Sequence, residues 1–107
     1  MALLAMCMPI LPGKMDTWKA MMSQIKSTPD FANSREAAGV HERSIVQNTP
    51  VGDFLIITVE GDDPAASWAK IMSTMPPEFA EFAAEVHGLD VNAPPPPLPE
   101  MFFDSRA

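Results

Sequence analysis

An α+β fold is what the sequence predicts, and three observations lead to it. The first is an apolar run over residues 2–11 on both alternating sets of positions, which suits a strand buried on both faces. The second is a pair of strand-like segments, 40–48 and 53–60, joined by the turn-forming sequence NTPVGD, which predicts a β-hairpin. The third is helical spacing of large apolar residues both before and after that hairpin.

Four helices are expected, two before the hairpin and two after it. Proline or a capping side chain marks their starts, and glycine marks two of their ends. The first helix alternates Met15, Trp18, Met22 and Ile25 with lysines, which makes it amphipathic. The expected ranges are 15–25, 28–39, 64–75 and 78–87, with Thr28 and either Asp62 or Asp63 as N-caps and with Gly39 and Gly88 as stops.

The remaining segment, 93–107, reads as a proline-rich connector followed by a short strand in EMFFDS. With that strand the order becomes strand, helices, strand, strand, helices, strand. This is the split β-α-β order of a ferredoxin-like fold with a four-stranded antiparallel sheet, and helices on one face. Residues 1–107 are therefore expected to form a single domain whose first and third strands lie in the middle of the sheet.

The third strand predicts an assembly as well as a fold. Leu55, Ile57 and Val59 point to one side of it, and Phe54 and Ile56 point to the other. One set packs under the helices, whereas each large side chain left facing water costs about 1.5–3 kcal/mol. A second copy related by a two-fold axis covers that face, so we expect a homodimer that forms a dimeric barrel.

Charge and cysteine content restrict the partners. The net charge is −7 and only seven residues are basic, so neither nucleic acid nor an anionic membrane is an expected partner. The single Cys7 rules out an internal disulfide or a multi-cysteine metal cluster, and in its apolar run it is expected to pack as a small hydrophobe. The apolar start lacks the basic region of a signal peptide, so we expect a cytoplasmic protein.

Familiar catalytic and cofactor motifs are missing from the sequence. His41 and His87 are far apart and form no HxH or HExxH motif, so no metal site is expected, and a haem axial histidine has no better support. There is no G-x-S-x-G, no P-loop and no G-x-G-x-x-G, which argues against serine hydrolase chemistry and nucleotide binding. No cofactor is expected.

The triplet His41-Glu42-Arg43 is the first candidate site. Strand alternation places His41 and Arg43 on one face and Glu42 on the other, so the histidine and the glutamate are not an adjacent acid–base pair. A catalytic interpretation makes His41 a base and Arg43 the group that holds the resulting anion. A structural interpretation, which we prefer, is a polar edge strand that resists sheet-to-sheet aggregation.

Trp18, Trp68 and His87 are the second candidate site. Both tryptophans lie within apolar helical stripes, where core packing is the usual role. They also suit a pocket for a flat ligand, since the nine methionines supply adaptable side chains around them. His87 ends a helix, where the dipole favours its charged form, so a capping role is preferred over a ligand role.

Several segments together resemble one known superfamily. They are LPGKMDTWKAMM, HERSIVQNTPVGDFLIITVEGDDP, FAAEVHGLD and PLPEMFFD, and they span most of the chain. The chain resembles the dimeric α+β barrel superfamily, which includes antibiotic-biosynthesis monooxygenases and stress-responsive proteins, and it looks closest to an uncharacterised branch of short proteins within it.

The resemblance implies a function without supplying a catalytic motif. Some members bind aromatic or quinone-like compounds between sheet and helices and oxidise them without metal or flavin. It therefore implies a small-molecule-binding protein, with a cofactor-free monooxygenase-like enzyme as one form of it. The absence of tyrosine excludes a phenolic acid. The alternative is a non-enzymatic homodimeric structural or interaction domain.

Overall fold

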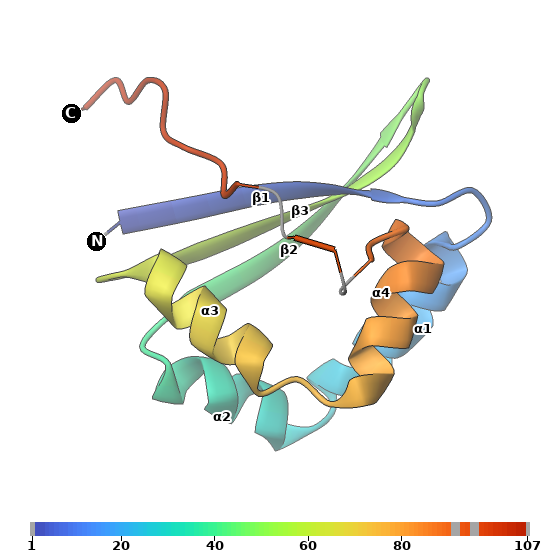
Figure 1. Ribbon diagram of the computed structural model, residues 1–107, viewed down its shortest axis with the longest axis horizontal. Coiled ribbons are helices and arrows are strands. Elements are labelled where there is room, and N and C mark those ends of the chain that lie inside the picture. Colours follow the sequence, from blue (N-terminus) through green and yellow to red (C-terminus); the bar gives the residue numbers. More distant parts are fainter. Residues whose placement is uncertain (1, 91–92, 95–96, 107) are drawn as a thin grey trace.

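A three-stranded antiparallel sheet with four helices packed on one of its faces forms the fold (Figure 1). The computed structural model describes residues 2–90, 93–94 and 97–106. The α+β class and the antiparallel sheet are confirmed. The elements are β1 (Ala2–Ile10), α1 (Met15–Lys26), α2 (Pro29–Ala37), β2 (His41–Thr49), β3 (Gly52–Gly61), α3 (Pro64–Ser73) and α4 (Pro77–His87).

The strand order is β1-β3-β2, so β3 alone is central and β1 is an edge strand. The prediction that both β1 and β3 lie in the middle is therefore wrong. β3 pairs with β1 through Met6 opposite Ile57, and with β2 through Val46 opposite Leu55. This register places the apolar sets of the strands on one common face.

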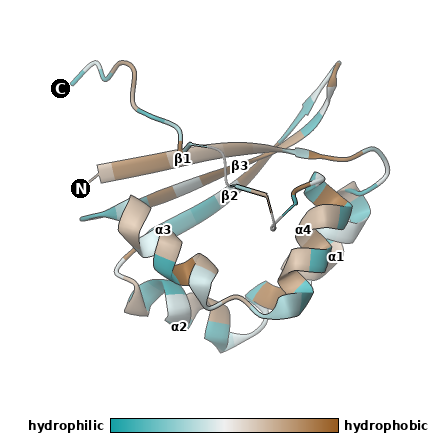
Figure 2. Cartoon of the chain, in the orientation of Figure 1, coloured by the Kyte–Doolittle hydropathy of each residue, from teal (hydrophilic) through white to brown (hydrophobic). Residues whose placement is uncertain are grey.

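The core lies between that face and the helices. Its buried side chains come from β1, from β3 and from the three helices α1, α3 and α4, and Val59 and Val86 are fully enclosed. Figure 2 shows the contrast that produces this arrangement, with apolar colour along β1 and more polar colour along β2. The buried cluster consists of Leu4, Met6, Ile10, Trp18, Leu55, Ile57, Val59 and Val86.

The predicted fourth strand is wrong for the residues that the structure describes. Residues 97–106 form no strand, and four large apolar side chains there are exposed (Leu98, Met101, Phe102 and Phe103). Prolines at 94–97 and 99 have no N–H to donate, which leaves a short run available for a ladder. Within one chain, the proline-free residues 100–106 pair with no described strand.

Polar contacts, rather than burial, attach α2. No α2 side chain is buried, in contrast to the other three helices. Arg35 Nε donates to Glu42 Oε1 on β2 at 2.9 Å, and the Arg35 guanidinium stacks on the Phe31 ring at 4.1 Å. Ser67 Oγ of α3 donates to the carbonyl O of Ala38 at 3.1 Å. These contacts hold α2 against β2 and α3.

Helix ends follow the expected chemistry in two places. Asp63 is the N-cap of α3, since its carboxylate accepts from the Ala66 N–H at 3.2 Å, which settles the choice between Asp62 and Asp63. Gly88 follows α4 in the left-handed conformation, with φ of 68°, as a helix stop requires. Within the described part of the chain, no helix has the length and apolar character needed to cross a membrane.

Candidate functional site

Strand alternation in β2 separates the members of the His41-Glu42-Arg43 triplet. Glu42 lies opposite Val59 and so faces the helices, where it pairs with Arg35. His41 lies opposite Glu60, on the face without helices, which we call the open face. Arg43 shares that face with His41. The three side chains therefore form no single site within one chain.

Arg43 is already neutralised on the open face. Its guanidinium forms an ion pair with the carboxylate of Glu60 on β3, and both side chains are partly exposed. An anion bound by Arg43 would therefore compete with Glu60. Beside this pair, directly opposite Arg43, the buried Thr58 hydroxyl has no hydrogen-bond partner among the described residues. The open face thus carries one polar group that a partner could satisfy.

The open face also carries an apolar row. A row across the sheet brings together Cys7, Ile56 and Ile45, one from each strand. Ile45 is 49% exposed and Leu3 is 46% exposed, and Cys7 is exposed as well. This is the face that the sequence predicts to be covered by a second copy.

His87 lies on the other side of the sheet and is buried. Its Nδ1 lies 2.7 Å from the carbonyl O of Pro9 in β1. A carbonyl only accepts hydrogen bonds, so Nδ1 carries the proton and donates it. The ring also meets Phe82 edge to face, with centroids 6.2 Å apart. His87 therefore fastens the end of α4 to β1, a contact that helix-end chemistry alone does not predict.

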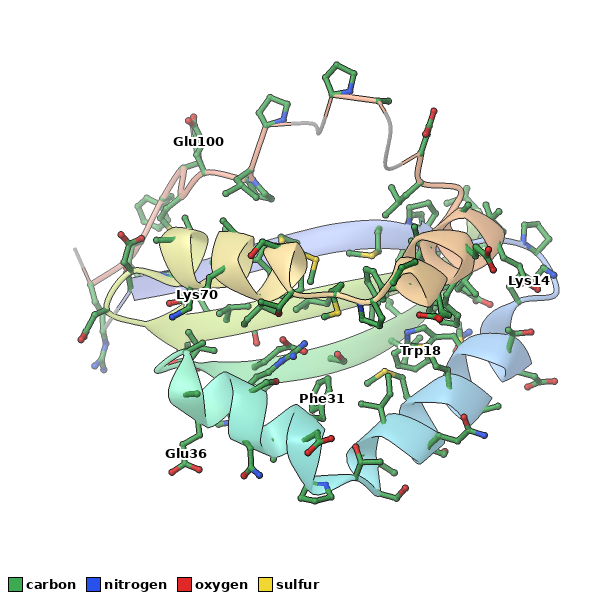
Figure 3. All side chains as sticks on the ribbon, turned by 60° about the horizontal axis from the view of Figure 1, so that its bottom comes forward. Lys14, Trp18, Phe31, Glu36, Lys70 and Glu100 are labelled. Atoms are coloured by element: carbon green, nitrogen blue, oxygen red, sulfur yellow. The ribbon has the colours of Figure 1, made fainter. Side chains whose placement is uncertain are left out.

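Trp18 and Trp68 lie on the same side as His87. Trp18 of α1 is a buried core residue, and in Figure 3 it lies between its helix and the sheet, as does Phe31 of α2. Trp68 of α3 packs against the core cluster but stays partly exposed. The sheet therefore separates Trp18, Trp68 and His87 from His41 and Arg43.

Beneath the helices lies a set of inward-facing side chains that are not fully covered. Met8, Met22, Trp68 and Phe82 pack against the core cluster and remain partly exposed, and we call them the Met–aromatic layer. They come from β1, α1, α3 and α4 respectively. Phe82 links the layer to His87 through their ring contact. The sequence places each in an apolar stripe, but only the fold brings them together.

A solvent-open hollow of about 240 Å³ lies elsewhere, where the end of β1 approaches the β2–β3 turn. It is lined by residues 9–12 and 51–54. Its one charged side chain, Asp53, already accepts a hydrogen bond from Asn48 at 2.6 Å. None of the five predicted site residues lines it, so it is a weak candidate for chemistry.

Metal chemistry has no visible site in the described part of the chain, where no group of three or more His, Cys, Asp or Glu side chains could hold an ion. No protein-family model, curated protein or solved structure matches the chain. The small α+β fold is compatible with the ferredoxin-like arrangement, and the likeness to dimeric α+β barrels rests on the sequence segments and this fold class alone.

Proposed function

We propose that this protein binds a small, flat, apolar or aromatic molecule against the Met–aromatic layer. The observation that carries the proposal is the partial exposure of Trp68, Phe82, Met8 and Met22, although all four face the core. Covering a large apolar side chain contributes about 1.5–3 kcal/mol. A ligand that lies against these side chains and covers their exposed parts gains that burial.

The chemistry of the layer suits a flat ligand. Trp68 and Phe82 offer ring faces and edges for stacking, and Met8 and Met22 adapt their flexible side chains to varied shapes. His87 adjoins the layer through its ring contact with Phe82 and offers it a polar side chain. The ligand class is therefore an aromatic or quinone-like compound with few charges.

Cofactor-free oxidation of that compound is the enzymatic form of the proposal. His41 and Arg43 lie across the sheet from the layer, so within one chain they do not reach a ligand bound there. His87 is then the candidate base for such a ligand, and a reaction assay with quinols and oxygen tests this form separately from binding.

Thermal unfolding with a panel of flat aromatic and quinone compounds tests binding. A ligand at a free concentration of 100 times its Kd stabilises the folded state by about 2.7 kcal/mol, which raises the Tm. Trp68→Ala and Phe82→Ala should each remove most of the ligand-induced rise, measured against the variant's own unliganded Tm. Phe102→Ala is the matched control, because that aromatic ring is 97% exposed and lies far along the chain from the layer. Equal rises in all three variants would contradict the proposal.

A second candidate function, favoured by the open face, is a homodimeric domain without catalysis. We infer that the apolar row of Cys7, Ile56 and Ile45 is covered by a second copy, since these side chains otherwise face water. The two candidates separate in the same ligand screen. If the protein is a homodimer and no flat compound raises its Tm, the structural role is supported.

A further inference from the structure

One edge of the sheet is open over a defined length. In an antiparallel strand the N–H and C=O of a residue point to the same neighbour. The carbonyl of Pro9 accepts from His87, and the N–H of Leu11 donates to the Val86 carbonyl at 2.8 Å, so both residues point away from β3 toward the end of α4. By the same alternation, Leu3, Ala5 and Cys7 also point their backbone groups away from β3.

No described strand pairs with those three residues, because β1 pairs only with β3. The end of α4 covers the outer edge at Pro9 and Leu11, and the edge is open from Leu3 to Cys7. This open length accommodates about five to seven residues of an added strand at about 3.4 Å each.

The C-terminal segment of the same chain has exposed apolar side chains. Residues 97–106, which we call the apolar arm, are exposed throughout, with Phe102 at 97% and Phe103 at 76%. Residues 100–106 contain no proline, so each can donate and accept as a strand does. The open edge of β1 and the apolar arm therefore have similar lengths, and the backbone groups of each can pair with those of the other.

The direction of the arm indicates which edge it meets. Figure 1 shows the arm passing the start of β1 and extending beyond it, on the side of the sheet away from the helices. Glu100, labelled in Figure 3, lies on this segment, outside the packed body. That is the side on which the second copy lies in the homodimer proposed above.

We propose that the apolar arm is exchanged between copies, so that residues 100–106 of each chain pair with the open edge of β1 in the other. Phe102 and Phe103 are then covered by the partner, and the sheet gains the fourth strand that it lacks within one chain. This proposal rests on the homodimer, and the experiment separates failure of the exchange from failure of the dimer.

Cysteine trapping tests the exchange with the full chain. Cys7 is exposed on the open edge, and directly opposed residues of antiparallel strands have Cα atoms about 4.5–5.5 Å apart, within disulfide range. One added cysteine at a time leaves both phenylalanines intact and samples both sides of the arm. The variants are Glu100→Cys, Met101→Cys, Asp104→Cys and Ser105→Cys, with the unmodified chain and each variant combined with Cys7→Ser as controls.

After mild oxidation, variants with the added cysteine on one side of the arm should give a disulfide-linked dimer on a non-reducing gel. The same variants combined with Cys7→Ser should give no such dimer. Sedimentation of the unmodified chain reports the dimer independently. A dimer whose disulfides form only within one chain, or not at all, overturns the exchange and leaves the homodimer standing. A monomer in sedimentation overturns both.

A second measurement does not depend on disulfide geometry. Phe102→Ser combined with Phe103→Ser should raise the Kd of the dimer at least about tenfold, since each ring loses its cover on the partner. Val51→Ser, at an 86% exposed position in the β2–β3 turn, is the matched control and should leave the Kd unchanged. An unchanged Kd in the double variant overturns the exchange.

Discussion

At the scale of single residues, Glu42 is the member of the His41-Glu42-Arg43 triplet with the clearest role. Its side chain is only 6% exposed and that of Arg35 is 11% exposed, so their ion pair is largely removed from water. Such a pair is weak evidence of net stabilisation, but breaking it leaves an uncompensated buried charge. Glu42, which strand alternation separates from the candidate residues His41 and Arg43, is thus an anchor for α2.

Glu42→Ala should lower the free energy of unfolding by about 3 kcal/mol, because it leaves the Arg35 guanidinium buried and unpaired. Chemical denaturation measures the change. Glu36→Ala on the same helix is the control, since Glu36 is exposed and points outward in Figure 3, and should change it by less than about 0.5 kcal/mol. The double variant Arg35→Met with Glu42→Leu should recover most of the loss. Equal effects of Glu42→Ala and Glu36→Ala would contradict the anchoring role.

At the scale of elements, sequence patterns predict helix ends and strand faces well, because interactions between nearby residues determine them. Proline and Asp63 at the start of α3, and Gly88 after α4, mark boundaries that the structure reproduces within a residue or two. The alternation in β3 predicts which side chains face the core, because that set matches its buried residues. Each of these features depends on neighbours a few positions away.

The fourth strand and the candidate site depend on contacts between residues far apart in the sequence. Sequence patterns predict such contacts poorly. MFF has the composition of a strand, but a strand needs a paired edge, and no strand among the described residues pairs with it. The contact of His87 with the Pro9 carbonyl joins residues 78 positions apart. The separation of Trp68 from His41 by the sheet likewise follows from packing, and no spacing in the sequence encodes it.

The weak attachment of α2 predicts its dynamics. It buries no side chain, whereas α1 buries Trp18 and α4 buries Val86. Elements with few buried apolar contacts open at low free energy, so α2 amides should exchange at least about tenfold faster than those of α4. Native-state hydrogen exchange resolved by residue measures this, and Glu42→Ala should accelerate α2 more than α4. Equal protection of the two helices would show that other contacts hold α2.

At the scale of the whole molecule, the proposed homodimer is tested at the open face. Ile45→Asp should raise the dimer Kd at least about tenfold, because it places a charge on an apolar surface that the second copy covers in the proposed homodimer. Sedimentation across a concentration series measures the shift. The folded monomer should tolerate the change, since Ile45 is 49% exposed on an edge strand, and Val51→Asp is the control at a position outside the face. A Kd equal to that of the control would place the interface elsewhere.

In the proposed exchange of arms, the open edge of β1 also sets where the assembly stops growing. When two copies exchange arms reciprocally, both edges are filled and growth stops at two. When one copy gives its arm without receiving one, each addition leaves one edge and one arm free, so chains continue to add into a filament. In the proposed exchange, reciprocity at the same three backbone positions, Leu3, Ala5 and Cys7, thus separates a closed dimer from a growing fibre.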